Sequence, residues 1–217
     1  ENTPLGNPFW EYAQKKIAIE NMLMRAYREL GFPVTIVRPS FTYGDECIPT
    51  PVSIDYTPAA RLKKGLPLIV HGDGTSLWVM TYASDFAKGL VGLLGHEGAI
   101  GEGVHITSDE VLTWNQVHEL IAKALGVAPK LVHMPSEFIA RINPRIGAGL
   151  LGDKAYSMVF DNSKIKRLVP DFSCAVSFER GIARTIAYLE AHPEAQKTDA
   201  DAATEEILRV WRQAMEG

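Results

Sequence analysis

The sequence is poor in the features that mark disulfide-bonded, membrane and nucleic-acid-binding proteins. It has 2 cysteines in 217 residues, Cys47 and Cys174, which is too few for a disulfide framework and gives no metal-site spacing. No apolar run approaches the ~20 residues of a membrane span. The net charge of −4 argues against a general nucleic-acid binder, whose surface is usually basic. We therefore expect a cytoplasmic protein with reduced thiols, a small-molecule substrate and no metal or membrane partner.

What the sequence does contain begins with a predicted long helix near its start. Asn7 can cap this helix with its side-chain oxygen, and Pro8 follows at the first helical position. Apolar residues then recur at roughly helical spacing until Gly31, which is typical of a helix end. Tyr12 and Lys16 are four residues apart, so both side chains should lie on one face.

Tyr12 and Lys16 together can act on a proton. A lysine ammonium one helical turn away favours the phenolate form of a tyrosine. That tyrosine can then take or give the proton of a hydroxyl or carbonyl group while a hydride moves on the carbon. The alternative is a half-buried tyrosine beside a solvated lysine, because this spacing also occurs by chance in many helices.

The residues after the helix favour the chemical interpretation. The apolar, β-branched run 34–37 predicts a buried strand of a parallel sheet, followed by Arg38-Pro39-Ser40-Phe41-Thr42-Tyr43-Gly44. A helical Tyr-x-x-x-Lys, then a strand ending in Arg-Pro and a Tyr-Gly, resembles the extended short-chain dehydrogenase/reductase family. Within it, the likeness is to the NAD-dependent epimerase/dehydratase branch. Gly65-Leu66-Pro67-Leu68, Gly72-Asp73-Gly74 and Asp85-Phe86-Ala87 follow in the order typical of that branch.

This resemblance implies an α/β fold, with the C-terminal part of a Rossmann-type parallel sheet and a smaller mixed α/β substrate-binding domain. It implies NAD or NADP as cofactor, and a sugar-like substrate, nucleotide sugars included, that reacts at a hydroxyl or carbonyl. In this role Tyr12 is the acid/base, and Lys16 also binds the nicotinamide ribose. The backbone around Pro39 and Ser40 would contact the nicotinamide end. The helix of Tyr12 resembles the one that pairs in the family's homodimers.

The family's glycine-rich phosphate loop is missing ahead of Tyr12. A Rossmann half would need about 100 residues there, and eleven are present. Gly147, Gly149 and Gly152 have Gly-x-Gly-x-x-Gly spacing, but no strand signal precedes them, so we expect a mobile segment over 145–157. We expect the chain to be the C-terminal part of a longer enzyme, inactive and without dinucleotide binding alone. Its domains would be 1–45 from the Rossmann unit and 46–217 for substrate, with 84–107 returning to the Rossmann sheet.

Two residues depart from the pattern of the branch. Trp78 stands where an arginine contacts the substrate diphosphate, and Phe41 stands where many relatives have a substrate-binding asparagine. An indole cannot replace a bidentate guanidinium on phosphate. Phe41 and Trp78 therefore predict a more apolar or aromatic substrate pocket, with ordinary core packing as the alternative. The lost arginine also favours a second hypothesis, that the chain resembles atypical, non-catalytic family members that serve as binding or regulatory proteins, some of them on RNA. The Tyr12 and Lys16 pair and the negative net charge oppose this hypothesis.

Capping residues and periodicity predict the other elements. Expected strands cover 68–70, 77–81, 104–106 and 130–133. Expected helices cover 57–64 with Thr57 as cap, 85–94 with Ser84, 114–125 with Thr113, about seven residues from Ser136, 178–192 with Ser177, and 199–215. Residues 160–168 resemble a late turn and helix of the family. Asp85 is expected to be structural. Lys164, Lys166 and Arg167 form a local basic cluster, for which a solvated helix face is favoured over a phosphate site.

Overall fold

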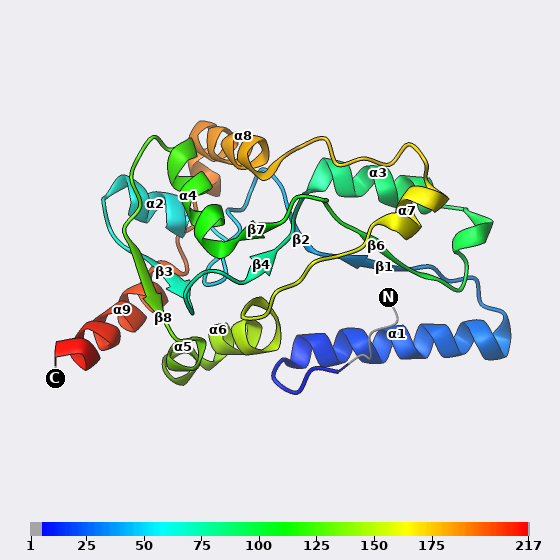
Figure 1. The fold of residues 1–217 in the computed structure, drawn as a ribbon, viewed down its shortest axis with the longest axis horizontal. Coiled ribbons are helices and arrows are strands. Elements are labelled where there is room, and N and C mark those ends of the chain that lie inside the picture. Colours follow the sequence, from blue (N-terminus) through cyan, green and yellow to red (C-terminus); the bar gives the residue numbers. More distant parts are fainter. Residues whose placement is uncertain (1–5, 217) are drawn as a thin grey trace.

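The computed structural model describes residues 6–216, which form two lobes of helices and short strands (Figure 1). The first lobe holds α1 (Glu11–Leu30), the parallel pair β1 (Ile36–Pro39) and β6 (Gly103–Ile106), α3 (Ala83–Leu93) and α7 (Ser163–Leu168). Helix α1 lies on one side of β1 and β6, and α3 and α7 lie on the other. The layered arrangement is typical of a Rossmann-type sheet.

The pairing of β6 with β1 brings together residues 36–39 and 103–106 in parallel, with Val37 opposite Val104. The run around 34–37 thus forms a strand, displaced toward Pro39, but the expected burial is wrong, because no residue of β1 is buried. A core cluster that includes Leu93, Val104, Ile106, Ile165 and Phe172 fills the space between this pair and α3 and α7. The expected parallel pairing is confirmed, and it is what places β1 beside the helix of Tyr12.

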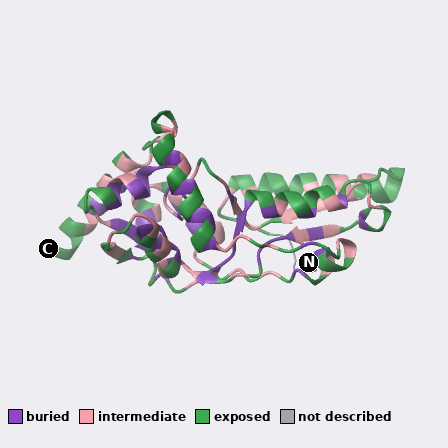
Figure 2. Cartoon of the chain, turned by 90° about the horizontal axis from the view of Figure 1, so that it is seen from above, coloured by how far each residue is buried: buried purple, intermediate pink, exposed green. Residues whose placement is uncertain are grey.

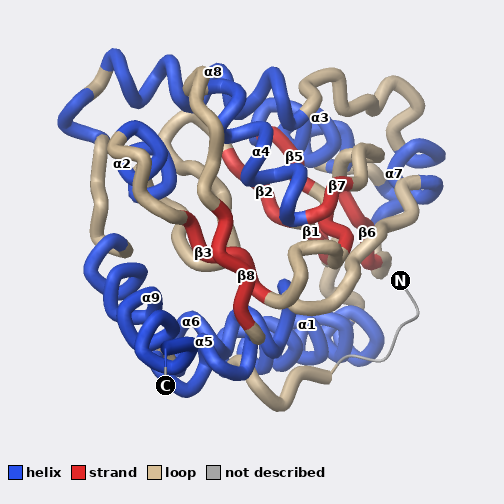
Figure 3. Tube along the Cα trace, turned by 60° about the vertical axis from the view of Figure 1, so that its left-hand side comes forward, coloured by secondary structure: helices blue, strands red, loops and turns tan. Residues whose placement is uncertain are grey.

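The second lobe is built on the parallel pair β3 (Leu68–His71) and β8 (Leu131–Met134). Figure 3 shows β3 and β8 side by side, with α9 (Asp201–Glu216), α5 (Ser136–Ile142) and α6 (Pro144–Gly149) along one side. The larger core lies among the helices α2 (Thr57–Lys63), α4 (Trp114–Ala124) and α8 (Phe178–Ala191). Short 3-10 turns cover Glu97–Ala99 and Pro193–Ala195. Buried residues gather mainly in this lobe (Figure 2).

Two further strand pairs link the lobes. The parallel pair is β2 (Phe41–Tyr43) with β5 (Met80–Tyr82), and the antiparallel pair is β4 (Leu77–Trp78) with β7 (Leu112–Thr113). The single strand expected over 77–81 is therefore wrong in detail, because the chain changes partners at Val79. No helix in the described range 6–216 is long and apolar enough to cross a membrane.

Three of the predicted helix ends are present in the structure. Thr113 accepts from the backbone N–H of Gln116, whose side chain accepts from the Thr113 N–H, so the predicted cap is a full capping box. Ser177 caps α8 as predicted, at the N–H of Arg180. Gly31 ends α1 in the left-handed conformation, φ 66°, which favours glycine.

Other caps were wrong. Helix α1 begins at Glu11 rather than Pro8, and Asn7 Oδ1 accepts from the N–H of Trp10 at 3.1 Å in the turn before it. Thr57 is the first residue of α2 rather than its cap, and Asp55 Oδ1, two residues earlier, accepts from the Thr57 N–H at 2.9 Å. Ser84 and Ser136 lie inside α3 and α5 rather than before them.

The expected mobile segment over 145–157 is wrong over most of its length. Residues Pro144–Gly149 form α6 and Leu150–Lys154 form a π-helical turn. Asn143 caps α6, with its Oδ1 accepting from the N–H of Ile146 at 3.1 Å. Gly147 packs directly on Ala140 of α5, where any Cβ would overlap the alanine. The glycine therefore serves close helix packing and not flexibility.

Asp85 near the start of α3 has the structural role expected of it. Its side chain is buried, its Oδ2 accepts from the N–H of Val176 at 2.8 Å, and its Oδ1 pairs with Lys88 Nζ at 2.7 Å. The aspartate thereby ties α3 to the segment that leads into α8.

Candidate active site

Tyr12 and Lys16 lie on one face of α1, as their spacing predicts. Lys16 Nζ is 5.4 Å from the centre of the Tyr12 ring, within cation–π range. Tyr12 is 55% exposed, so its hydroxyl is accessible to a ligand. The Trp10 ring supports it from the other side, with 4.9 Å between ring centres. An accessible phenol beside an ammonium is an arrangement able to move a proton.

A groove of about 480 Å³ runs between α1 and β1. Tyr12, Lys16 and Pro39 all line it, so the structure brings three of the four predicted cofactor residues together. Ser40 follows at the end of β1, and its hydroxyl is engaged by Thr81 Oγ1 at 2.9 Å. The side chain of Ser40 thus has a structural partner, while its backbone stays beside Pro39.

Glu20 and Arg38 hold the two walls of this groove together, a contact that the motif analysis did not identify. Arg38 Nε donates to Glu20 Oε2 at 3.2 Å, and a second guanidinium nitrogen pairs with the other carboxylate oxygen. Both side chains are largely buried. Because Glu20 is four residues beyond Lys16 on α1, this bidentate pair fixes the helix relative to β1.

A second groove, of about 350 Å³, opens on the other side of Tyr12. Its wall is formed by Trp10, residues 50–54 and, from the α6 region, Arg145 and Lys154. Lys154 Nζ lies 5.1 Å from the Trp10 ring centre and 5.6 Å from the Phe41 ring centre. Sequence reasoning missed both cations because it assigned them to a mobile loop, although the Asn143-Pro144 helix start was a usable signal.

The two predicted substrate residues lie in different surroundings. Phe41 contacts Lys154, which lines the same groove as Tyr12. Trp78 is 3% exposed and stacks on Trp114 with 5.7 Å between ring centres. Its burial favours the alternative of ordinary core packing, so the arginine position of the family supplies no group to either groove.

The buried imidazole of His71 lies next to the backbone of Lys154. Burial lowers the pKa of His71 to about 4, so its imidazole is neutral at pH 7. Its Nε2 lies 2.9 Å from the Lys154 carbonyl oxygen, and a neutral ring can donate its one N–H there. Burial also raises the pKa of the Asp153 carboxyl, against the opposing charge of Lys154 Nζ at 3.3 Å.

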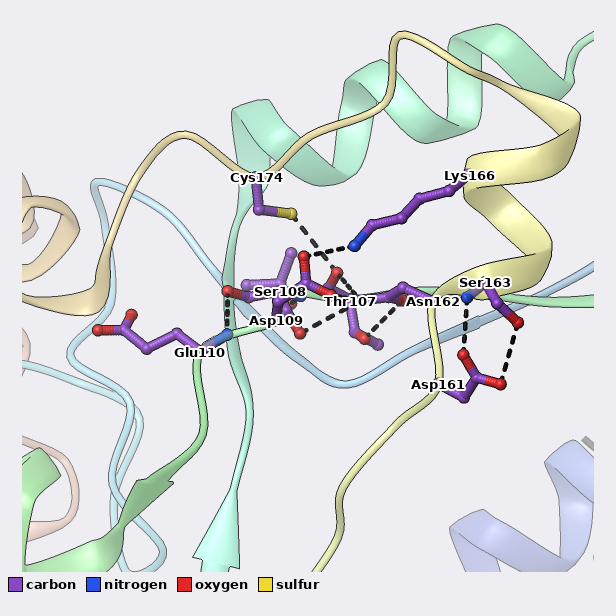
Figure 4. Close-up of polar contacts among 10 residues, drawn as sticks. Thr107, Ser108, Asp109, Glu110, Asp161, Asn162, Ser163, Lys166 and Cys174 are labelled. Atoms are coloured by element: carbon purple, nitrogen blue, oxygen red, sulfur yellow. Dashed lines mark hydrogen bonds and ion pairs between the residues drawn. The ribbon is translucent and has the colours of Figure 1, made fainter.

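Two lysines of the basic cluster at α7 pair with acids, and Figure 4 shows one of them, Lys166, beside Asp109. Lys166 Nζ pairs with Asp109 at 2.8 Å, and Lys164 Nζ pairs with Glu102 at 3.1 Å. Asn162, next to α7, donates to the Thr107 carbonyl at 2.7 Å and to Asp109 Oδ1 at 3.1 Å. These contacts join α7 to the end of β6, which agrees with a helix face rather than a phosphate site. Within residues 6–216, no group of three potential ligands could hold a metal ion.

Comparisons with known proteins agree with this geometry. Residues 1–107 match the model of the NAD dependent epimerase/dehydratase family. The chain is 27% identical over 167 residues to 2'-dehydrokanamycin reductase of Streptomyces kanamyceticus, over 76% of this chain and 47% of that protein. It is 30% identical over 181 residues to UDP-N-acetyl-alpha-D-glucosaminuronate decarboxylase of Bacillus cytotoxicus, over 82% and 53% respectively. The resemblance to the extended short-chain dehydrogenase/reductase family, in its epimerase/dehydratase branch, is confirmed.

Solved structures agree at the level of the fold. UDP-glucuronic acid 4-epimerase from Bacillus cereus, in complex with UDP-glucuronic acid and NAD, has a TM-score of 0.70 at 21% identity. The likeness covers 88% of this chain and 56% of the epimerase chain. The α/β, Rossmann-type fold expected from the sequence is thereby confirmed. The chain spans about half the length of the relatives it matches.

Proposed function

We propose, from its place in the epimerase/dehydratase branch of the short-chain dehydrogenases/reductases, that this chain carries the acid/base site of an NAD- or NADP-dependent enzyme. The enzyme is an oxidoreductase or an epimerase/dehydratase that acts on a sugar-like hydroxyl or carbonyl. One observation carries the proposal: Tyr12 lines both grooves. A hydride must pass between cofactor and substrate beside the group that moves the proton. Tyr12 meets this condition because it lines both grooves, one for the cofactor and one for the substrate.

The groove between α1 and β1 is assigned to the nicotinamide end of the cofactor. Lys16 Nζ and the backbone of Pro39 and Ser40 would hold that end beside Tyr12, because Lys16 and Pro39 line this groove and not the second one. When bound, NAD or NADP supplies hydride acceptance and return. The protein's own share of the reaction is then orientation and proton transfer.

Tyr12 performs the proton transfer in this proposal. Its hydroxyl oxygen, as phenolate, takes the proton of the substrate hydroxyl, and it returns the proton when a carbonyl is reduced. Lys16, over the ring of Tyr12, stabilises the negative charge of the phenolate. The second groove holds the sugar ring, with Phe41 behind Lys154 as an aromatic wall. A sugar ring agrees with the similarity to UDP-N-acetyl-alpha-D-glucosaminuronate decarboxylase of Bacillus cytotoxicus.

The decisive experiment replaces Tyr12 by Phe in the complete protein that carries this chain, and Tyr27 by Phe as control. Both tyrosines lie on α1, and Tyr27 is one of its exposed residues away from the grooves. Tyr12→Phe should lower kcat by about 100-fold or more, the usual loss for a general acid/base, with cofactor affinity retained. Tyr27→Phe should keep turnover within about twofold.

Near wild-type turnover in Tyr12→Phe would remove Tyr12 from the mechanism. Selective retention of the protein on RNA at physiological salt, with no hydride transfer on a panel of sugar substrates, would favour the non-catalytic binding function. The two results are independent, since one is read from kinetics and the other from binding.

We also propose that α1 is the homodimer contact. None of its residues is buried, and its apolar side chains Met22 and Leu30, which do not line the cofactor groove, are 54% and 80% exposed. Exposed apolar side chains gathered on one helix are typical of an interface. Met22→Glu should then lower the mass measured by light scattering from that of a dimer to that of a monomer.

A further inference from the structure

Lys16 lies between two side chains of α1 that can each use its charge. Tyr12 comes four residues before it and Glu20 four residues after it, so all three side chains lie on one face of the helix. Lys16 Nζ is 5.4 Å from the centre of the Tyr12 ring, and no ion pair within residues 6–216 involves Lys16. The lysine therefore lies over the phenol and is not paired with the carboxylate.

The same helix shows how an acid at this spacing behaves when it has no other partner. Glu11 and Lys15 are also four residues apart, and they pair at 2.7 Å. An acid that precedes the lysine is the better order, yet the reverse order also stabilises a helix. Spacing alone therefore does not explain why Lys16 and Glu20 are unpaired. The difference lies in what Glu20 contacts.

Arg38 of β1 holds the Glu20 carboxylate. Arg38 Nε donates to Glu20 Oε2 at 3.2 Å, and Arg38 Nη2 pairs with Oε1, so both carboxylate oxygens already have a cationic partner. The two side chains are 23% and 16% exposed, and an ion pair shielded from water in this way is screened little by salt. The planar guanidinium fork also fits a carboxylate better than a flexible ammonium does. Arg38 is therefore the preferred partner of Glu20.

We propose that Arg38 is a positioning residue of the reaction, because by binding Glu20 it leaves Lys16 to stabilise the Tyr12 phenolate. This inference rests on the proposed function and adds to it a group that does not touch the reacting atoms. Without Arg38, Glu20 would draw the ammonium of Lys16 away from Tyr12 and neutralise its charge. Glu20 and Tyr12 are eight residues apart, about 12 Å along the helix, and the screening length in physiological salt is about 8 Å. The effect of Glu20 on Tyr12 therefore passes through Lys16.

Few other charges face this part of α1. Among the described residues that line the groove between α1 and β1, the titratable or charged ones are Tyr12, Lys16, Glu20 and Arg38. On its other side Tyr12 lines the second groove, to which Arg145 and Lys154 add two cations. These two cations are the same in every variant below, so they do not contribute to the differences between variants.

The test titrates Tyr12 in the complete, cofactor-free protein by the 13Cζ NMR signal of labelled tyrosine, assigned as the signal that Tyr12→Phe loses. Arg38→Met releases Glu20 to Lys16 and should raise the midpoint of this titration by about one pH unit, a tenfold loss of phenolate below it. The double variant Arg38→Met with Glu20→Gln also removes the competing carboxylate. It should return the midpoint to within about 0.3 pH unit of the wild type, as should Arg38→Lys, which keeps a cation on Glu20.

Glu20→Gln separates this role from simple anchoring of the helix. The amide keeps the shape of the side chain and an acceptor for Arg38, but it has no charge to offer Lys16, so the midpoint should not rise. Glu11→Gln, which removes an exposed acid of the same helix, is the matched control and should shift the midpoint by less than about 0.3 pH unit.

Three results would overturn the proposal. The first is an unchanged midpoint in folded Arg38→Met, and the second is a double variant with the same raised midpoint as Arg38→Met. The third is an equal rise in Glu20→Gln and Arg38→Met, which would mean that the ion pair only anchors α1 on β1. Arg38→Gln, which keeps an amide donor, replaces Arg38→Met if circular dichroism shows that Arg38→Met does not fold, and the same outcomes apply to it.

This inference and the proposed function fail in different ways. Retained turnover in Tyr12→Phe would reject the acid/base role, while the NMR titrations would still report whether Arg38 keeps Lys16 available to Tyr12. Lost turnover in Tyr12→Phe together with an unchanged midpoint in Arg38→Met would keep the acid/base role and reject the role of Arg38.

Discussion

Lys16 lies over the ring of Tyr12, whereas its neighbour Lys15 pairs with Glu11 at 2.7 Å. Lys15 and Glu11 are 71% and 78% exposed, so their ion pair is weak. The helix thus carries two adjacent lysines with the same charge and different surroundings. Replacing each lysine in turn therefore distinguishes a catalytic role of Lys16 from a general effect of positive charge on the helix.

Lys16→Met should lower kcat of the complete protein by about 100-fold, because the Tyr12 phenolate loses its stabilising charge. It should also weaken cofactor affinity, since Lys16 lines the groove assigned to the nicotinamide ribose. Lys15→Met should change both quantities by less than about twofold. Steady-state kinetics and fluorescence titration with NAD and NADP measure the two effects. Equal losses in the two variants would show that only net charge matters.

The sequence predicted the elements whose signals are local. The capping box of Thr113 and Gln116 needs four consecutive residues, and the left-handed Gly31 needs one. Tyr12 and Lys16 were found because a helix places residues four apart on one face, whatever the rest of the fold does. The parallel β1 was predictable from its short apolar run and the motif that follows it.

Features that depend on distant partners were not predictable. The strand expected over 77–81 is divided because its halves pair with β7 and β2, far away in sequence. Gly147 resembled a flexible residue because its packing partner Ala140 belongs to another helix. Lys154 had no motif at all, since its position arises from donors 40 to 83 residues away. Such sites appear only once the tertiary contacts are known.

The buried guanidinium of Arg61 should be a major determinant of the stability of the second lobe. Its side chain is 1% exposed, and it pairs with Asp201 and Glu205 of α9, each at 2.6 Å, and with the Pro67 carbonyl at 2.9 Å. Asp201→Asn with Glu205→Gln leaves the buried charge uncompensated and should lower the free energy of unfolding by about 3 kcal/mol.

The control for this double variant is Glu190→Gln, which removes an exposed pair with Lys63 at 2.5 Å and should cost less than about 1 kcal/mol. Urea unfolding followed by circular dichroism measures both. A double variant as stable as Glu190→Gln would show that water reaches Arg61 and that α9 is not anchored by it.

Two buried histidines predict that stability falls in mild acid. Burial lowers the pKa of both His71 and His118 to about 4, from an ordinary value near 6.5. In the unfolded chain both imidazoles are therefore protonated below about pH 6.5, whereas in the folded chain they become protonated only near pH 4. The stabilising contribution is fully present above pH 6.5 and is lost as pH falls toward 4, on the order of 3 kcal/mol for each histidine.

His118→Gln should remove one of the two imidazoles whose protonation makes the free energy of unfolding depend on pH. The slope of unfolding free energy against pH, measured in urea between pH 4.5 and 6.5, should decrease by up to about 1.4 kcal/mol per pH unit. His133→Gln is the control, because His133 is exposed and should leave the slope unchanged. An identical slope in His118→Gln and the wild type would mean that the buried ring does not resist protonation.

Gly181 marks the closest contact between α8 and the strands beneath it. A Cβ at this position would overlap the Tyr43 hydroxyl and lie 2.9 Å from Tyr82 Cδ2. Tyr43 cannot easily move, since its ring packs edge-on against Tyr82 and at a tilt against Phe178, with 5.3 Å between ring centres in each pair. Gly181→Ala should therefore overpack this core and lower the free energy of unfolding by about 1–3 kcal/mol.

Gly149 in α6 provides the opposite case for the same substitution. The atom nearest to a Cβ there is Lys154 Nζ at 3.9 Å, an ordinary contact. Gly149→Ala should leave stability unchanged or raise it by about 0.5–1 kcal/mol, because alanine restricts the unfolded chain more than glycine does. Urea unfolding of the two variants in parallel measures the contrast. If Gly181→Ala were as stable as Gly149→Ala, α8 would have room to shift on the Tyr43 and Tyr82 rings, and the close approach would not be a constraint on the sequence.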